Sequence, residues 1–471
     1  MKKVNIIIVL LLLTASSCKK FTEVDAPYTS FNGQNVYTDN ATAIAAVTDI
    51  YTNMSNGAVS TSQIPSLSFF CGLSADELTL NSGVVTPLLV GHYTNNLSAT
   101  AAPVLWTNSY SAIYVANASI SGLTASTSLT PAVKQQLLGE CYFIRAFCYF
   151  YLTNLYGDVP LVTTPDYKTN GLMARTPANQ VWTQVIADLH RAQTLLSPTY
   201  VDATLQNAST ERVRPIKWTA TSLLARADLY TGNWQGADSA ATAVIGSNSY
   251  SLSPLSGTSR LFTKNCAEAI WQLQPVMTGW NTQDARVFVL PSTGPTTSTY
   301  PVYLSPRLVS AFETGDLRFT NWVQSVKVGT TTYYYPAKYQ SATLNAPVTE
   351  YNTVLRLGEQ YLIRAEARTQ NGNLTGALQD LNVIRQRAGL VPSTASTTAA
   401  LSTAILQEKR IELFTEYGAR WLDLKRTQTV NIVMGVETTL KGGNWNPIAQ
   451  YFPISTTELV NNPSLTQTPG Y

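Results

Sequence analysis

The stretch RAEARTQNGNLTGALQDL, from Arg364 to Leu381, decides the fold because the chain carries an internal echo of it. Gly372-Asn373-Leu374 followed by Ala377 matches Gly232-Asn233-Trp234 followed by Ala237. After each turn, apolar residues recur at i, i+3, i+7 and i+10: Leu374, Ala377, Leu381 and Ile384 in one copy, and Trp234, Ala237, Ala241 and Val244 in the other. This spacing marks one face of a helix. Two helices joined by a short Gly-Asn turn are typical of tetratricopeptide-type repeats.

The charges of this stretch do not repeat. When the two glycines are aligned, Arg226 falls on Glu366. The repeated features are the turn and the apolar face, so we interpret the stretch as helical scaffold and not as a catalytic charge cluster.

Composition excludes one class of partner. The chain of 471 residues has a net charge of +3, and its lysines and arginines form no dense tract. Nucleic-acid binding normally requires a basic patch, so we expect no nucleic-acid partner.

The N-terminus predicts export. Lys2 and Lys3 precede the apolar run Ile6–Leu13, and small residues lead to Cys18. The run is too short to span a bilayer, which indicates a signal peptide over residues 1–17. A cysteine directly after small residues is typical of a bacterial lipoprotein, so we expect Cys18 to be lipidated and to anchor the chain to a membrane.

The remaining cysteines, Cys71, Cys141, Cys148 and Cys266, show no metal-ligand or redox spacing. We expect buried thiols, no metal site and no cofactor.

Helical periodicity dominates the rest of the chain. The segments with this pattern are Ala41–Met54, Trp106–Ile120, Pro131–Tyr156, Val181–Leu196 and Trp218–Tyr230. Long stretches without it are Phe70–Leu97 and Ser247–Asn345, and Thr331–Pro336 within the second predicts a strand. The predicted fold is mostly α, built of tetratricopeptide-like helix pairs with long irregular loops and a few short strands. A tether over 18–40 precedes a single domain over 41–471, with its N-terminal part at about 41–246 and its C-terminal part at about 247–471.

Several motifs resemble one family in the same order along the chain. They are Ser74–Glu77, Phe143–Phe147 leading to Tyr156–Leu161, Glu268–Gln272, Tyr351–Leu390, Glu408–Arg426, and Pro453-Ile454 with Pro469-Gly470-Tyr471. Together they resemble the SusD/RagB family of outer-membrane nutrient-binding lipoproteins, over nearly everything after Cys18. Lys19 and Lys20 stand where surface-exported members often carry acidic residues.

The resemblance implies a SusD-like α/α superhelix and a partner, a SusC-like TonB-dependent transporter. It implies a protein anchored in the cell outer membrane and facing the extracellular side, which captures an oligosaccharide and delivers it to that transporter. It also places ligand contacts in the irregular loops.

Sugar rings stack on aromatic side chains, and their hydroxyl groups need polar partners. The irregular loops contain both kinds of residue. The predicted ligand-binding residues are Asp76, His92, Tyr93, Asn95, Asn96, Trp280, Asp284, Arg286, Tyr300 and Tyr303.

Three other functions stay open: a peptide-binding lipoprotein of the same family, a surface glycoside hydrolase, and a structural transporter subunit without a ligand site. Hydrolysis requires two carboxylates flanking a cleft. The densest acidic set, Glu408, Glu412, Glu416 and Asp423, is interleaved with basic residues at helical spacing and predicts intrahelical ion pairs. We therefore expect no catalytic residues and no enzyme activity.

Four further residues carry structural predictions. Arg145 and Arg364 lie among apolar neighbours and are expected to join helices through buried hydrogen bonds. Trp421 is expected in the core, and His190 at a surface or interface.

Overall fold

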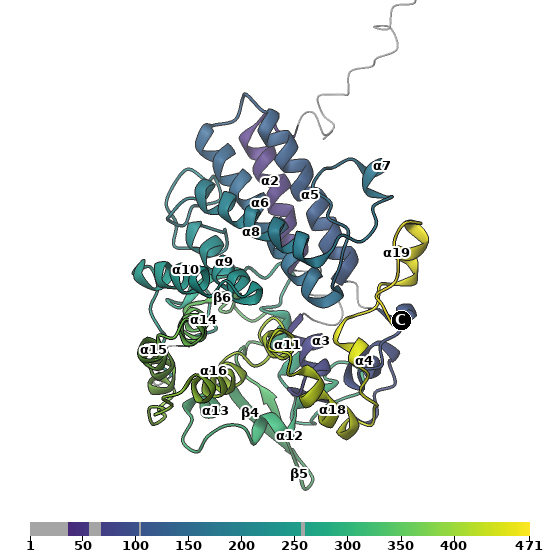
Figure 1. The fold of residues 1–471 in the computed structure, drawn as a ribbon, viewed down its shortest axis with the longest axis vertical. Coiled ribbons are helices and arrows are strands. Elements are labelled where there is room, and N and C mark those ends of the chain that lie inside the picture. Colours follow the sequence, from purple (N-terminus) through teal and green to yellow (C-terminus); the bar gives the residue numbers. More distant parts are fainter. Residues whose placement is uncertain (1–35, 56–66, 103–104, 256–259) are drawn as a thin grey trace, which may run out of the picture.

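Helices make up most of the molecule, which confirms the predicted fold class (Figure 1). The computed structural model describes residues 36–55, 67–102, 105–255 and 260–471, so the predicted signal peptide and Cys18 lie outside the described residues. The helices of the first half are α2 (Asn40–Asn53), α3 (Leu67–Ser74), α4 (Pro87–Tyr93), η3 (Ala99–Ala101), α5 (Leu105–Ala125), α6 (Pro131–Tyr156), α7 (Tyr167–Asn170), α8 (Ala178–Leu195), α9 (Lys217–Thr231) and α10 (Trp234–Gly246).

The second half mixes helices with short strands. Its helices are α11 (Gln283–Phe288), α12 (Pro306–Val309), α13 (Leu317–Trp322), α14 (Leu357–Gln370), α15 (Leu374–Arg387), α16 (Thr398–Glu412), α17 (Ala419–Arg426), α18 (Val430–Leu440), η4 (Pro447–Gln450) and α19 (Thr456–Asn461). The strands are β1 (Leu78–Leu80), β2 (Ala269–Leu273), β3 (Val302–Leu304), β4 (Val323–Val328), β5 (Thr331–Pro336) and β6 (Asn352–Arg356). They form antiparallel pairs β1–β3, β2–β6 and β4–β5.

The helices pack in series. α5, α6, α8, α9 and α10 contact one another in chain order, and α10 then packs on α14, which contacts α15 and α16. In Figure 1 the bundle of α2, α5, α6 and α8 occupies one end, and the β4–β5 hairpin occupies the opposite end.

The repeated Gly-Asn turns are built in the same way. Gly232 and Gly372 have φ angles of +77° and +81°, a left-handed conformation that glycine adopts without a Cβ penalty. Each glycine follows a helix and lets the chain reverse into the next one. This confirms the scaffold interpretation of the stretch around Gly372.

The asparagine of each turn caps the second helix. The side chain of Asn233 accepts a hydrogen bond from the Gly236 amide at 3.2 Å, and that of Asn373 accepts one from the Gly376 amide at 3.0 Å. A Cβ at Gly236 or Gly376 would collide with the capping side chain. The repeat therefore also includes the glycine three residues after each asparagine, Gly236 and Gly376, which the sequence analysis did not single out.

Two arginines join neighbouring helices, as predicted: Arg145 is buried, whereas Arg364 is partly exposed. Arg145 on α6 donates to Asp188 on α8 at 2.8 and 2.7 Å, and both side chains are buried. Arg364 on α14 donates to Asp380 on α15 at 2.8 and 2.6 Å. Trp421 is fully buried, whereas His190 lies at the surface.

The prediction of intrahelical ion pairs was wrong for most of the acidic set. Arg356, at the end of β6, pairs with Glu268, Glu412 and Glu416, and all four side chains are largely withdrawn from solvent. Only Asp423 has a partner at helical spacing, Arg426 at i+3. The other carboxylates lie on the buried side of α16 or just beyond it, where partners come from other elements.

Thr331–Pro336 forms β5, as predicted. The stretch Phe70–Leu97 was expected to be irregular, but it contains α4 and most of α3. Every residue of α3 is buried. A helix enclosed on all sides has no polar face, so it gives no amphipathic period in the sequence.

Candidate functional site

The two aromatic loops singled out from the sequence meet in the structure. Strand β1 pairs with β3, and this pairing places Thr79 opposite Tyr303. Asp76 lies just before β1, and its carbonyl accepts a hydrogen bond from Ser305 Oγ at 2.5 Å. This bond extends the contact between the two loops. Segments that lie more than 200 residues apart in the chain therefore form one surface.

Half-buried tyrosines gather on this surface. Tyr303 lies between the buried residues Val302 and Leu304, so strand alternation directs its ring to the outer side. Its ring meets Tyr333 of β5 edge to face, with centroids 5.1 Å apart. Tyr93, at the end of α4, forms a side-chain hydrogen bond with Thr79, the residue that pairs with Tyr303, and is within electrostatic range of Tyr303; burial and, to a lesser extent, Tyr303 raise its pKa. We call Tyr93, Tyr303 and Tyr333 the tyrosine platform.

Tyr300 lies beside the platform. With Tyr303 and Tyr333 it packs against a small core of Leu290, Tyr335 and Ala337. Its side chain is half-buried, so it has both a packed and an accessible part.

Lys441 contacts both the tyrosine platform and the end of α3. Its Nζ donates to the carbonyl groups of Leu73 at 2.6 Å, Ser74 at 3.3 Å and Ala75, and so caps the C-terminal end of α3. The same Nζ lies 5.3 Å from the ring centroid of Tyr93. Burial lowers the pKa of Lys441 to about 7.

Polar groups border the platform. Glu437 of α18 is within electrostatic range of Tyr93 and forms an ion pair with Arg307 at 3.1 Å. The Arg307 side chain is 52% exposed, so it is accessible to a ligand. Asn96 is also exposed.

Other predicted ligand residues are buried and engaged by protein groups. Asp76 is 3% exposed and forms ion pairs with Arg410 and Arg420 at 2.7 and 2.8 Å. Asn95 is 5% exposed, has a φ of +51° and donates to Thr438 at 2.8 Å. These contacts shape the loops next to the platform and leave little of either side chain for a ligand.

His92 is enclosed. Its ring packs against Phe70 and Phe452, and its Nδ1 lies 2.9 Å from Ser74 Oγ. Burial lowers its pKa to about 3, so the ring is neutral at physiological pH. His92 therefore orders the end of α4 and is not positioned to contact a ligand.

Trp280 belongs to a separate cluster. The guanidinium of Arg286 lies 5.0 Å from its ring centroid, and Arg286 Nη1 also contacts Met277 Sδ at 3.1 Å. Asp284 is buried, and Asn352 donates to it at 3.4 Å. Among the described residues, no ring–ring or cation–π contact joins Trp280 to the tyrosine platform.

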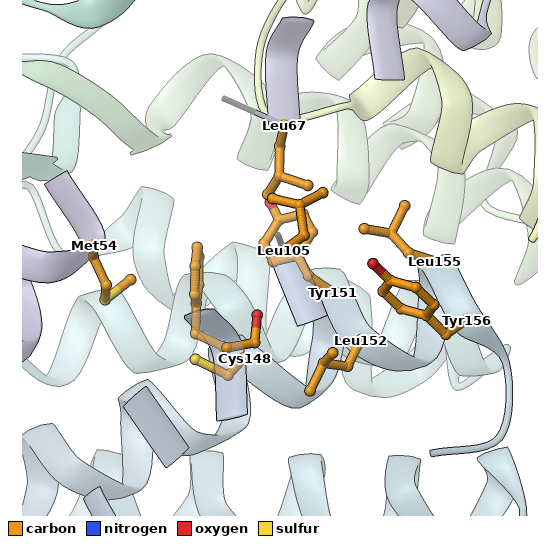
Figure 2. Close-up of a pocket in the computed structure, with 10 residues that line it drawn as sticks. Met54, Leu67, Leu105, Cys148, Tyr151, Leu152, Leu155 and Tyr156 are labelled. Atoms are coloured by element: carbon orange, nitrogen blue, oxygen red, sulfur yellow. The ribbon is translucent and has the colours of Figure 1, made fainter. Parts of the chain in front are cut away.

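Two small cavities in the protein interior are too small for a sugar. Figure 2 shows one beside α6, enclosed by side chains that include Leu105, Tyr151 and Leu155; its volume is about 10 Å³. A second, near Arg226 and Tyr417, has about 20 Å³. Such volumes hold roughly one water molecule.

Sequence reasoning missed Tyr333 and Lys441. The β-branched and aromatic residues of Thr331–Pro336 identified a strand, and an aromatic residue on such a strand is a usable signal for Tyr333. Nothing in the sequence points to Lys441, because its hydrogen-bond partners lie more than 360 residues away.

No group of three or more His, Cys, Asp or Glu residues in the described ranges has a metal-binding arrangement. Among the same residues, no helix combines the length and apolar character needed to cross a bilayer.

Comparison with known proteins assigns the family. The model described as "SusD family" matches residues 310–471, and the model described as "Starch-binding associating with outer membrane" matches residues 24–229. The chain belongs to the SusD/RagB family. This confirms the family expected from the sequence motifs.

Relatives of the SusD/RagB family match over different lengths. SusD-like protein P38 of Formosa agariphila is 26% identical over 530 residues, covering 99% of this chain and 98% of the relative. SusD-like protein P25 of the same organism is 27% identical over 285 residues, covering 58% of this chain and about half of the relative, 52%.

Solved structures share the SusD fold. A SusD superfamily protein from Bacteroides vulgatus has a TM-score of 0.79 at 20% identity, covering 93% of this chain and 100% of that one. A structure titled "Laminarin binding SusD-like protein" has a TM-score of 0.72 at 22% identity, covering 92% and 99%. These similarities confirm the predicted SusD-like fold.

Proposed function

We propose that this protein binds an oligosaccharide at the tyrosine platform and delivers it to a TonB-dependent transporter. In this proposal Cys18 carries the lipid that anchors the chain at the outer face of the outer membrane. The observation that carries the proposal is that three half-buried tyrosines from distant segments lie on one surface: Tyr303 and Tyr333 meet edge to face, and Tyr93 is within electrostatic range of Tyr303.

The chemistry of the platform suits a sugar chain. Aromatic rings stack on the apolar C–H faces of sugars, and tyrosine adds a hydroxyl group that forms hydrogen bonds. Arg307, Glu437 and Asn96 supply charged and amide groups at the border. An apolar surface with a few placed polar groups is the usual composition of a ligand site.

Family descriptions support the same class of ligand. One matching family model is described as starch-binding, and a structural neighbour is described as laminarin-binding. Starch and laminarin differ in linkage, so these descriptions favour a glycan without selecting one.

We propose binding without catalysis. A glycosidase site needs two carboxylates that flank the scissile bond. Near the platform Glu437 is paired with Arg307, and Asp76 is buried between two arginines. Both are held in ion pairs within the protein and are poorly suited to act as a general acid or a nucleophile.

Calorimetry tests the proposal. The chain without residues 1–18 is titrated with α-glucans, β-glucans and short peptides, and we expect millimolar to micromolar binding of at least one glycan and none of the peptides. Binding of peptides alone would instead support the peptide-capturing alternative. Shortened oligosaccharides after long incubation would support a hydrolase.

Delivery has a separate test. Co-purification from the outer membrane should recover a TonB-dependent transporter with the wild-type chain. Cys18→Ala should release the chain from the membrane fraction, and its retention there would contradict the predicted lipid anchor.

A further inference from the structure

A third cavity lies away from the tyrosine platform, at the C-terminal end of α6. Its volume is about 340 Å³, within the range of about 300–1,000 Å³ for small-molecule sites. It is formed where Tyr156–Asp158 meets Arg175, Pro447–Tyr451 and Thr468-Pro469. Two of these segments belong to motifs that the sequence singled out, and the proposed function uses neither.

The wall of this cavity combines apolar and polar groups. Pro447, Ile448 and Pro469 provide apolar surface, and Tyr451 provides an aromatic ring. Asp158 and Gln450 provide a carboxylate and an amide. This mixture suits a ring with hydroxyl groups better than a purely apolar ligand.

Arg175 is the positively charged residue that lines the cavity. Its Nε donates to the Asp158 carbonyl at 2.8 Å, and its Nη2 donates to the Tyr156 carbonyl at 2.6 Å. Its Nη1 is buried without a hydrogen-bond partner among the described residues. No carboxylate of the described residues lies within ion-pair distance of it, although Asp158 is near enough to act electrostatically.

A second cation lies behind the aromatic wall. Lys425 Nζ is 4.2 Å from the ring centroid of Tyr451 and donates to the Asn154 carbonyl. In the described part of the chain it also has no carboxylate partner. Arg145, by comparison, is paired with Asp188. Burial lowers the pKa of Lys425 to about 7, so Arg175 is the side chain that carries the positive charge offered to a ligand here.

We propose that this cavity binds a hexuronic acid, a sugar ring whose carboxylate is held near Arg175. The carboxylate supplies the missing acidic partner, and the ring occupies the space bounded by Ile448, Tyr451 and Pro469. The site is separate from the tyrosine platform, so the proposal stands independently of the proposed function.

Titration of the full mature chain, from Cys18, tests the proposal. The probes are D-galacturonic acid and D-glucuronic acid, with D-galactose, D-glucose and acetate as comparisons. We expect at least one uronic acid to bind about tenfold or more tightly than its neutral counterpart and than acetate, because a charge-assisted hydrogen bond contributes about this factor. Equal affinity for the neutral sugar, or for acetate, would overturn the proposal.

Variants place the ligand in the cavity. Arg175→Gln should weaken uronate binding about tenfold or more. Asp158→Asn retains the oxygen that accepts the Ala178 amide and removes a negative charge, so it should strengthen uronate binding. Ile448→Trp should block the cavity, while Arg191→Gln, at an exposed arginine of α8, should leave affinity unchanged.

The variants also guard against a folding artefact. If Arg175→Gln fails to fold, Asp158→Asn and Ile448→Trp still decide the result. Unchanged uronate affinity in Ile448→Trp would overturn the assignment to this cavity. Loss of uronate binding in Tyr303→Ala would also overturn it, because that result would place the ligand on the platform.

Discussion

Tyr303 and Tyr333 meet edge to face, with ring planes at 80°, although β3 and β5 belong to different two-stranded sheets. Each ring limits the rotation of the other, so the pair presents a defined surface and not two independent side chains. Rings fixed before binding lose little conformational freedom when a ligand stacks on them.

The first prediction concerns this pair. Tyr303→Ala or Tyr333→Ala should weaken glycan binding by about 1–3 kcal/mol, because each removes a stacking surface and frees its neighbour. Calorimetry measures the change. Tyr167→Ala is the matched control, because Tyr167 is 73% exposed on α7, well separated from β5 in Figure 1. An equal loss in the control would contradict a role specific to the platform.

Trp280 remains a predicted ligand contact. Arg286 covers one side of its ring, so at most the other side is open to a sugar. We expect Trp280→Ala to weaken glycan binding by about 1 kcal/mol, within the range for an aromatic contact. Unchanged affinity in the same calorimetric experiment would remove Trp280 from the site.

The Arg145–Asp188 pair should be important for stability. Arg145→Met leaves the buried Asp188 without its counter-charge and should lower the free energy of unfolding by about 3–5 kcal/mol. Adding Asp188→Leu removes the isolated charge and should restore part of the loss. Denaturant unfolding measures both variants, and a double variant no more stable than Arg145→Met would contradict the electrostatic explanation.

The repeated caps offer a matched comparison. Asn373→Ala should cost about 1 kcal/mol of stability, because the Gly376 amide loses its acceptor. Asn233→Ala removes the equivalent bond and also the hydrogen bond that Asn233 Nδ2 donates to Asp228 at 3.0 Å, so it should cost more. Thermal unfolding compares them, and an equal loss in the two variants would show that the bond to Asp228 adds nothing to stability.

Glu77 makes stability depend on pH. Burial, followed by the charge of Asp76, raises the pKa of Glu77 from its ordinary 4.5 to about 8 in the folded protein. Its contribution to stability is therefore fully present below about pH 4.5 and is lost as pH rises toward 8. The stability of Glu77→Gln relative to wild type should increase between pH 5 and pH 8. Unfolding curves that remain parallel over this interval would contradict the raised pKa.

The scaffold was predictable from sequence where its determinants are local. Gly372 and Asn373 specify a turn and a cap within a few residues, and their echo at Gly232 reveals the repeat. Thr331–Pro336 carries its strand pattern in six residues. The buried helix α3 was missed because complete burial removes the alternation of polar and apolar residues.

The site was only partly predictable. Tyr93 and Tyr303 were predicted from residue type and loop context, and the β1–β3 pair brings their loops to one surface. Asp76 looked equally suitable for a ligand, but its partner Arg420 lies 344 residues away and covers it. A single sequence does not reveal such distant pairings, so exposed and buried polar residues of a loop look alike.

The side-chain nitrogen of Lys441 makes two kinds of contact: it donates hydrogen bonds to carbonyl groups at the C-terminal end of α3, and it lies against the ring of Tyr93. A methionine would fill similar space but leave the carbonyl groups uncapped, and an arginine would place a broader, planar group at the same point. The side chain at position 441 is thus constrained by backbone geometry on one side and by the ring of Tyr93 on the other. If the ligand changes among relatives, this lysine should vary less than the tyrosine above it.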